Sequence, residues 1–151
     1  MMTRVRAAGV TLVLAAGLLG AGCGGQAALS RQEYSAELNA ICMQVSEDQR
    51  AVGQPSSLNE LATKGPRLVE ILDRALDEVR DLRPPKTLRV AHNRFVALAE
   101  ELNTNLLDLV EAAKANDQTK ASQVSSAIDL LDSQSEAIAR TQLGAPSCAQ
   151  S

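Results

Sequence analysis

Apolar residues recur along most of this chain at steps of three and four, the spacing that places them on one face of an α-helix. The first of these apolar seams follows Ser30, which forms a capping-box pattern with Glu33, and it ends at Gly53 and Pro55. Its apolar members are Tyr34, Leu38, Ile41 and Val45. The pattern predicts a first helix that opens at Ser30.

A second seam contains Gly65 and Pro66 near its middle. Its apolar members are Leu58, Leu61, Leu68, Leu72, Ala75, Val79 and Leu82. Proline lacks the backbone N–H that a helix uses and clashes with the turn before it, so this pair favours a break. The apolar register nevertheless continues across the pair. The pattern fits either one continuous, kinked helix or two helices packed along one line.

Turn signals separate the remaining two seams. Pro84-Pro85 predicts a turn, with Pro85 at the start of a third helix of about 30 residues. Asn116-Asp117 predicts the next turn and helix cap, and Gly144 followed by Pro146 stops the fourth helix. No stretch alternates with the period of a strand. Four amphipathic helices with short connections predict an all-α, antiparallel up-down four-helix bundle.

The first residues of the chain follow a different pattern. Arg4 and Arg6 precede an apolar run over residues 7–21, which ends in small residues. A short positive region followed by such a run is typical of a secretory signal. A membrane span needs about 20 mostly apolar residues, whereas this run is shorter and interrupted by glycine. We therefore expect residues 1–22 to be a signal peptide that is removed.

Cys23, flanked by glycines, resembles the acceptor of a bacterial lipoprotein signal, where small residues precede a cysteine that receives diacylglycerol. Ala21 and Gly22 match that pattern, while Gly20 stands where such signals usually have leucine. The resemblance implies a lipid anchor at Cys23 on the extracytoplasmic face of the cell membrane, followed by a flexible tether over residues 23–29. Ordinary secretion with a spare thiol at Cys23 is the alternative.

Cys42 and Cys148 are the two remaining cysteines. Disulfides persist in exported proteins, and neither cysteine has a neighbouring histidine or a C-x-x-C spacing that suggests a metal site. We predict one disulfide between them, within a bundle domain over residues 30–148 that precedes a tail at 149–151. Since Cys42 lies well inside the first helix, residues 144–148 must run back along the bundle, or the first helix must project past its end.

Few residues offer catalytic or ligand-binding chemistry. His92 is the one histidine, and its place beside the seam residue Ala91 predicts a boundary or surface position. One histidine does not make a metal site, and no nucleotide-binding or hydrolase motif is present. Two aromatic residues, Tyr34 and Phe95, and an excess of acidic over basic residues argue against a nucleic-acid partner. We expect no enzymatic activity and no cofactor.

Basic residues cluster around the predicted turn between the second and third helices, at Arg80, Arg83, Lys86, Arg89 and Arg94. In an up-down bundle, this turn shares a pole with the start of the first helix, which is the tethered end. One hypothesis is that this pole faces anionic lipid headgroups or envelope polymers. The alternative is a solvated turn that Asp77, Glu78 and Asp81 neutralise.

Three further features carry a resemblance over nearly the whole mature chain. They are the stretch AELNAICMQ (36–44), the closing LGAPSC (143–148) and the proline-bearing turn LRPPKT. Together with Cys23, they resemble small helical lipoproteins of high-GC Gram-positive bacteria, a resemblance that brings no family activity with it. We expect a non-enzymatic interaction module of the cell envelope that contacts an envelope protein or polymer. The alternative is a small-ligand-binding or sensor domain, which needs a pocket lined by the helix seams.

Overall fold

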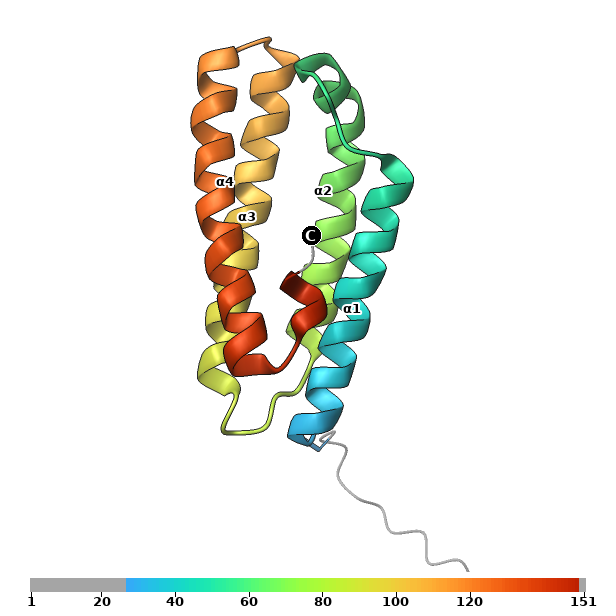
Figure 1. The fold of residues 1–151 in the computed structure, drawn as a ribbon, viewed down its shortest axis with the longest axis vertical. Helices are drawn as coiled ribbons and strands as arrows, with labels where there is room; N and C mark the ends of the chain where they lie inside the picture. Colours follow the sequence, from blue (N-terminus) through green and yellow to red (C-terminus); the bar gives the residue numbers. More distant parts are fainter. Residues whose placement is uncertain (1–26, 150–151) are drawn as a thin grey trace, which may run out of the picture.

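The computed structural model describes residues 27–149 of the chain as an antiparallel, up-down bundle of four α-helices (Figure 1). The helices are α1 (Arg31–Val52), α2 (Leu58–Asp81), α3 (Arg89–Lys114) and α4 (Gln118–Ile138). A π-helical turn, η1 (Ala139–Leu143), and a 3-10 turn, η2 (Pro146–Ala149), complete the fold. The predicted fold class is therefore confirmed. The predicted signal peptide, Cys23 and residues 150 and 151 of the predicted tail lie outside the described residues.

Local hydrogen bonds fix the starts and ends of the helices. The Glu33 backbone N–H donates to Ser30 Oγ (3.2 Å) and the Ser30 N–H donates to the Glu33 carboxylate (2.8 Å), which confirms the capping box. The Asp117 carboxylate caps α4 in a similar way, because it accepts from the Lys120 N–H (2.9 Å). Gly53 ends α1 with a φ of 78°, a left-handed value that glycine adopts without a steric cost.

The α2 helix runs without interruption through Gly65 and Pro66, which decides between the two alternatives in favour of one helix. Pro66 is exposed, whereas Gly65 is buried against α3. A Cβ atom at Gly65 would lie 2.3 Å from Val110 Cγ2. The glycine is therefore needed for the close approach of two helices and does not mark a break.

The α3 helix begins four residues later than predicted, at Arg89 instead of Pro85, and is 26 residues long. The Leu88 N–H donates to the Pro85 carbonyl (2.9 Å) and closes a turn before the helix starts. Leu88 is buried in the core. This turn reverses the chain, and its last residue, Leu88, packs into the core.

The main apolar cluster lies in the half of the bundle that contains the α2–α3 connection. Its members are Tyr34, Leu38, Val79, Leu88, Ala91, Phe95, Ile138, Ala139, Leu143 and Ala145. In this half, η2 lies between α1 and α4, two helices that have at most marginal direct contact (Figure 1). The C-terminal segment therefore closes the bundle on this side.

The predicted disulfide is present between Cys42 and Cys148, whose Cα atoms are 5.0 Å apart. Gly144, with a φ of 69°, reverses the chain after η1, so that η2 runs back along α1. Two side chains of α1 hold this returning segment: Ser35 Oγ donates to the Leu143 carbonyl (2.7 Å), and Asn39 Oδ1 accepts from the Ser147 N–H (2.9 Å). Of the two alternatives left open by the sequence, the structure has the first: residues 144–148 run back along the bundle.

Candidate functional site

Four basic residues belong to the end of the bundle where α1 and α3 begin and α2 ends, the lower end in Figure 1: Arg31, Arg83, Lys86 and Arg89. We call this end the basic pole. Arg31 begins α1, Arg89 begins α3, and the other two lie in the connection between α2 and α3. A hydrogen bond from the Leu29 N–H to the Arg83 carbonyl (2.9 Å) joins the start of the described chain to this connection. The start of the described chain and the basic turn thus share one pole, as the bundle topology predicts.

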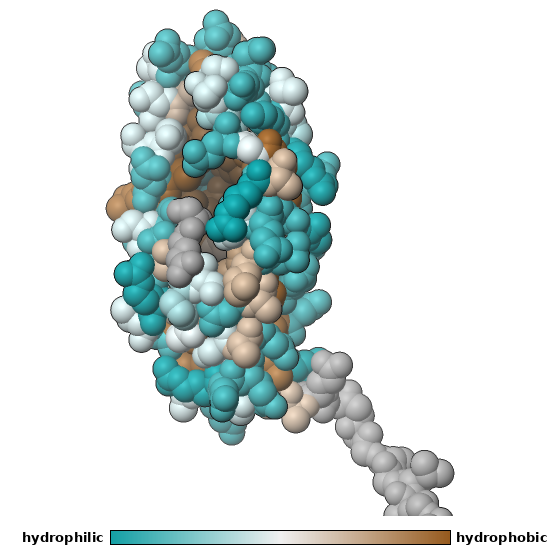
Figure 2. All heavy atoms as spheres, turned by 45° about the vertical axis from the view of Figure 1, so that its right-hand side comes forward, coloured by the Kyte–Doolittle hydropathy of each residue, from teal (hydrophilic) through white to brown (hydrophobic). Residues whose placement is uncertain are grey.

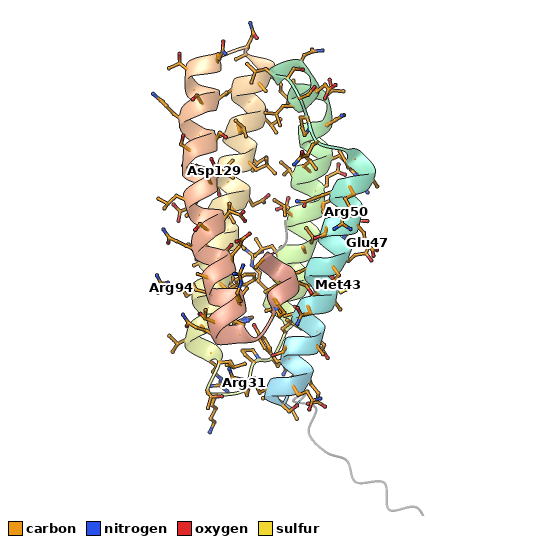
Figure 3. The ribbon with its side chains drawn as sticks, in the orientation of Figure 1. Arg31, Met43, Glu47, Arg50, Arg94 and Asp129 are labelled. Atoms are coloured by element: carbon orange, nitrogen blue, oxygen red, sulfur yellow. A yellow bond between two sulfur atoms is a disulfide. The ribbon has the colours of Figure 1, made fainter. Side chains whose placement is uncertain are left out.

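Two of the five basic residues singled out from the sequence lie away from this pole. Arg80 is on the side of the bundle, where it binds Glu100 (2.7 Å) and Asp77 (3.0 Å), and hydrogen bonds to these two carboxylates raise its pKa. Arg94 lies more than one helical turn beyond Arg89 and points sideways from α3 (Figure 3). The structure brings together Arg83, Lys86 and Arg89, and their contact with an anionic surface stays a prediction.

Of the three acidic residues that could neutralise the basic turn, Asp77, Glu78 and Asp81, two pair with arginines on the side of the bundle. Asp77 binds Arg80, and Glu78 lies 3.8 Å from Arg74 on the side of α2. Asp81, the last residue of α2, remains at the pole together with Glu33. The pKa of Glu33 is lowered because its carboxylate accepts hydrogen bonds from Ser30 in the capping box.

A shallow hollow of about 340 Å³ lies at the basic pole. It is lined by Ala28, Leu82, Arg83, Pro84 and Arg89. Two arginine residues thus line a hollow whose other lining residues are apolar. Val90, the residue after Arg89, is 83% exposed, so the chain has a solvent-exposed aliphatic side chain next to Arg89 in the sequence.

His92 is only 5% exposed, so the prediction of a boundary or surface position is wrong. Its Nδ1 lies 2.9 Å from the Tyr34 hydroxyl of α1, and the two rings meet edge to face with centroids 5.8 Å apart. Burial lowers the pKa of His92 and raises that of Tyr34 to about 12. The tyrosine hydroxyl gives the imidazole a buried partner, which is why a polar side chain is tolerated in the core.

This pair has the features of a structural contact. Within residues 27–149, the His92 side chain has no hydrogen-bond partner besides Tyr34, so no carboxylate, serine or cysteine is hydrogen-bonded to its imidazole. Both rings belong to the main apolar cluster or border it. No group of three or more histidine, cysteine or acidic side chains in the described part of the chain is arranged to hold a metal ion.

A second, smaller hollow of about 180 Å³ lies on the outer face of α1 beside η2. Its lining residues are Met43, Ser46, Glu47, Arg50 and Ser147, three of which are labelled in Figure 3. The first hollow lies at the pole and this one on the surface of α1. Leu82, at the end of the second apolar seam, is the one seam residue among the lining residues of these two hollows, and both hollows lie at the surface.

The half of the bundle beyond η2 is less completely closed. Many of its seam residues are only half-buried: Leu61, Leu68, Leu72, Leu106, Leu109, Val124 and Ile128. Figure 2 shows apolar atoms recessed between hydrophilic side chains in this upper half. Leu107 and Leu130 are exposed as well, at 47% and 61%. The far half therefore presents apolar surface to solvent, at the end opposite the basic pole.

Sequence patterns missed several polar contacts between elements of the described chain, among them one at the basic pole and one between α2 and α3. Arg31 donates to the Gln142 carbonyl (3.1 Å) and thereby ties α1 to η1 at the basic pole. Asn103, which is buried, donates to the Asp73 carboxylate of α2. The acid-free stretch from Leu82 to Ala99 is the sequence signal that could have defined the basic pole more closely.

Comparisons with protein-family models, curated proteins and solved structures found no match to this chain. In residues 27–149, none of the helices has the length and apolar character required to cross a bilayer.

Proposed function

We propose that this chain is a lipid-anchored protein of the extracytoplasmic face of the cell membrane, and that its helical bundle is a non-enzymatic interaction module. The pairing of the cysteines carries this proposal. The chain has three cysteines, and Cys42 is bonded to Cys148. No cysteine remains in the chain to pair with Cys23, which fits its role as the acceptor of a lipid.

The same disulfide supports the location. Such bonds form and persist in oxidising, extracytoplasmic compartments and are rare in the cytosol. The bond is also integral to the fold, since it fastens η2 to α1 where no helix closes the bundle. A protein that uses a disulfide in this way is suited to the environment that a lipoprotein signal leads to.

The role as an interaction module is supported by how the polar and apolar groups are used. The one histidine is occupied by its bond to Tyr34, and the half of the bundle far from the tether presents half-buried leucines to solvent. Exposed apolar surface of this kind is typical of contact with another macromolecule. We propose an envelope protein or polymer as the partner. The ligand-binding alternative has less support, because the two hollows are open at the surface and only one of their lining residues, Leu82, belongs to a helix seam.

Membrane fractionation of the cells that make the protein tests the anchor. The wild-type chain is expected in the membrane fraction, and the Cys23→Ser variant is expected to leave it, because two acyl chains supply about 0.8 kcal/mol per buried methylene. A Cys42→Ser/Cys148→Ser double variant is the matched control, since it removes thiols but keeps Cys23. If Cys23→Ser stays with the membranes, or if the control leaves them to the same extent, the proposed anchor is wrong.

A further inference from the structure

Most basic residues outside the basic pole are paired with carboxylates. Five of these nine described residues form ion pairs: Lys64, Arg67, Arg74, Arg80 and Lys114. Within residues 27–149, no such pair involves Arg31, Lys86 or Arg89. These three cations alone outnumber the two acids of the pole, Asp81 and Glu33. The pole therefore carries uncompensated positive charge.

The shape of the pole suits a phosphate-bearing surface. Arg83 and Arg89 border the same hollow of about 340 Å³, and arginine binds phosphate oxygens with its planar fork of N–H donors. The exposed aliphatic side chain of Val90 lies next to Arg89. Cationic groups beside an aliphatic one match the boundary between lipid headgroups and acyl chains.

The tether restricts which part of the bundle can face the bilayer. Seven residues, 24–30, separate Cys23 from α1, and a chain of that length spans at most about 25 Å when fully extended. The α3 helix alone, with 26 residues, is about 39 Å long. An anchor at Cys23 is therefore too short for the far end of the bundle to face the membrane head-on, and the basic pole is the end that meets it.

We propose that the basic pole docks on a bilayer surface that contains anionic phospholipids, with headgroup phosphates between Arg83 and Arg89 and with Lys86 beside them. This inference rests on the proposed lipid anchor, because the anchor brings the pole to the bilayer. Docking orients the long axis of the bundle away from the membrane, so that the half beyond η2, with its partly exposed leucines, faces a partner in the envelope. The anchor supplies the affinity, and the pole sets the orientation.

Vesicle binding by the polypeptide that starts at Gly24 tests the docking without the anchor. This polypeptide keeps every residue of the described fold, and far-UV circular dichroism verifies its helices beforehand. We expect it to bind vesicles of phosphatidylglycerol mixed with phosphatidylcholine, to ignore phosphatidylcholine alone, and to dissociate as salt is raised. Each cation near an anionic surface contributes about fivefold to partitioning, so Lys86→Gln/Arg89→Gln is expected to weaken binding about 20- to 30-fold. The double variant Lys114→Gln/Lys120→Gln, with the same change of charge at the far end, is expected to bind like the wild type.

A fluorescent reporter tests the orientation. The chain has no tryptophan, so a single tryptophan introduced by Val90→Trp at the pole, or by Leu107→Trp in the far half, reports its surroundings alone. With anionic vesicles that contain brominated lipids, we expect quenching for Val90→Trp and none for Leu107→Trp. Equal binding to phosphatidylcholine alone, indifference to salt, equal losses in the two charge variants, or equal quenching of the two reporters would overturn the inference. Because the polypeptide lacks Cys23, such a failure would not touch the fractionation test of the anchor.

Discussion

The close approach of α2 and α3 makes a specific prediction about Gly65→Ala. In an ordinary helix interior, replacing glycine by alanine stabilises by about 1 kcal/mol, because alanine has the higher helix propensity. At Gly65 the new Cβ would lie 2.3 Å from Val110 Cγ2, whereas ordinary contact begins at 3.4 Å. One of the two side chains, or one of the helices, must move by about 1 Å.

The cost of that movement exceeds the gain in propensity. Val110 is 2% exposed and has a β-branched side chain, which has essentially one favoured χ1 angle in a helix. Overpacking a close-packed core costs about 1–3 kcal/mol. Subtracting the propensity gain of about 1 kcal/mol leaves a net loss of about 1 kcal/mol in the free energy of unfolding for Gly65→Ala.

A double-mutant cycle with Val110→Ala separates the two effects. Val110→Ala alone removes buried methyl groups and is expected to cost about 2 kcal/mol. In that background the clash is gone, so Gly65→Ala is expected to stabilise by about 1 kcal/mol, the reverse of its effect in the wild type. Guanidinium unfolding, followed by far-UV circular dichroism with the disulfide intact, measures all four proteins. A Gly65→Ala variant that is equally stabilising in both backgrounds would refute the reasoning.

Further predictions concern the disulfide and the buried histidine. Replacing both Cys42 and Cys148 by alanine frees a loop with a sequence separation of 106, for which chain entropy predicts a loss of about 4–5 kcal/mol in chemical denaturation. A decrease of less than about 1 kcal/mol in the free energy of unfolding would contradict the conclusion that this disulfide holds η2 against α1. Tyr34→Phe leaves the buried His92 nitrogen without its partner and is expected to cost about 1–3 kcal/mol, and a neutral effect would show that water replaces the hydroxyl. Because burial lowers the pKa of His92 below its ordinary 6.5, the folded protein binds that proton more weakly than the unfolded chain. The stability that the neutral His92 side chain contributes is thus complete above pH 6.5 and is lost as the pH falls below that value. The free energy of unfolding should therefore decrease from pH 7 to 5 more steeply in the wild type than in His92→Gln.

Features that depend on neighbouring residues were predictable from the sequence. Ser30 and Glu33 lie three positions apart and form the capping box by themselves, and Gly53 ends α1 through its own backbone conformation. The number and order of the helices follow in the same way from seams and turns. The disulfide is an exception, since it joins residues 106 positions apart; it was predictable because only two cysteines remain besides Cys23 and because disulfides persist in exported proteins.

Features that depend on distant residues were not predictable in this way. Gly65 is explained by its close approach to Val110, which belongs to another helix, so the local sequence around Gly65 and Pro66 suggested a break that does not occur. The burial of His92 depends on Tyr34, 58 positions away, so its place beside the seam was misleading. The start of α3 was misplaced because proline fits both a turn and a first helical residue.

The candidate site shows the same division. The cluster of basic residues was visible in the sequence, since the positions around the turn are close together. The loss of Arg80 from the pole was not, because its partner Glu100 lies 20 positions further along and meets it only when α2 packs on α3. Arg31 was overlooked for the converse reason: it is remote from the turn in sequence and joins it through the topology of the bundle.

Mass spectrometry of the N-terminal peptide, from protein isolated from the cells that make it, tests the central claim most directly. We predict that the mature chain begins at Cys23, that this residue carries a diacylglyceryl group, and that Cys42 and Cys148 remain linked in the same molecules. A chain that retains residues 1–22, or one that carries a free thiol at Cys23, would contradict the account.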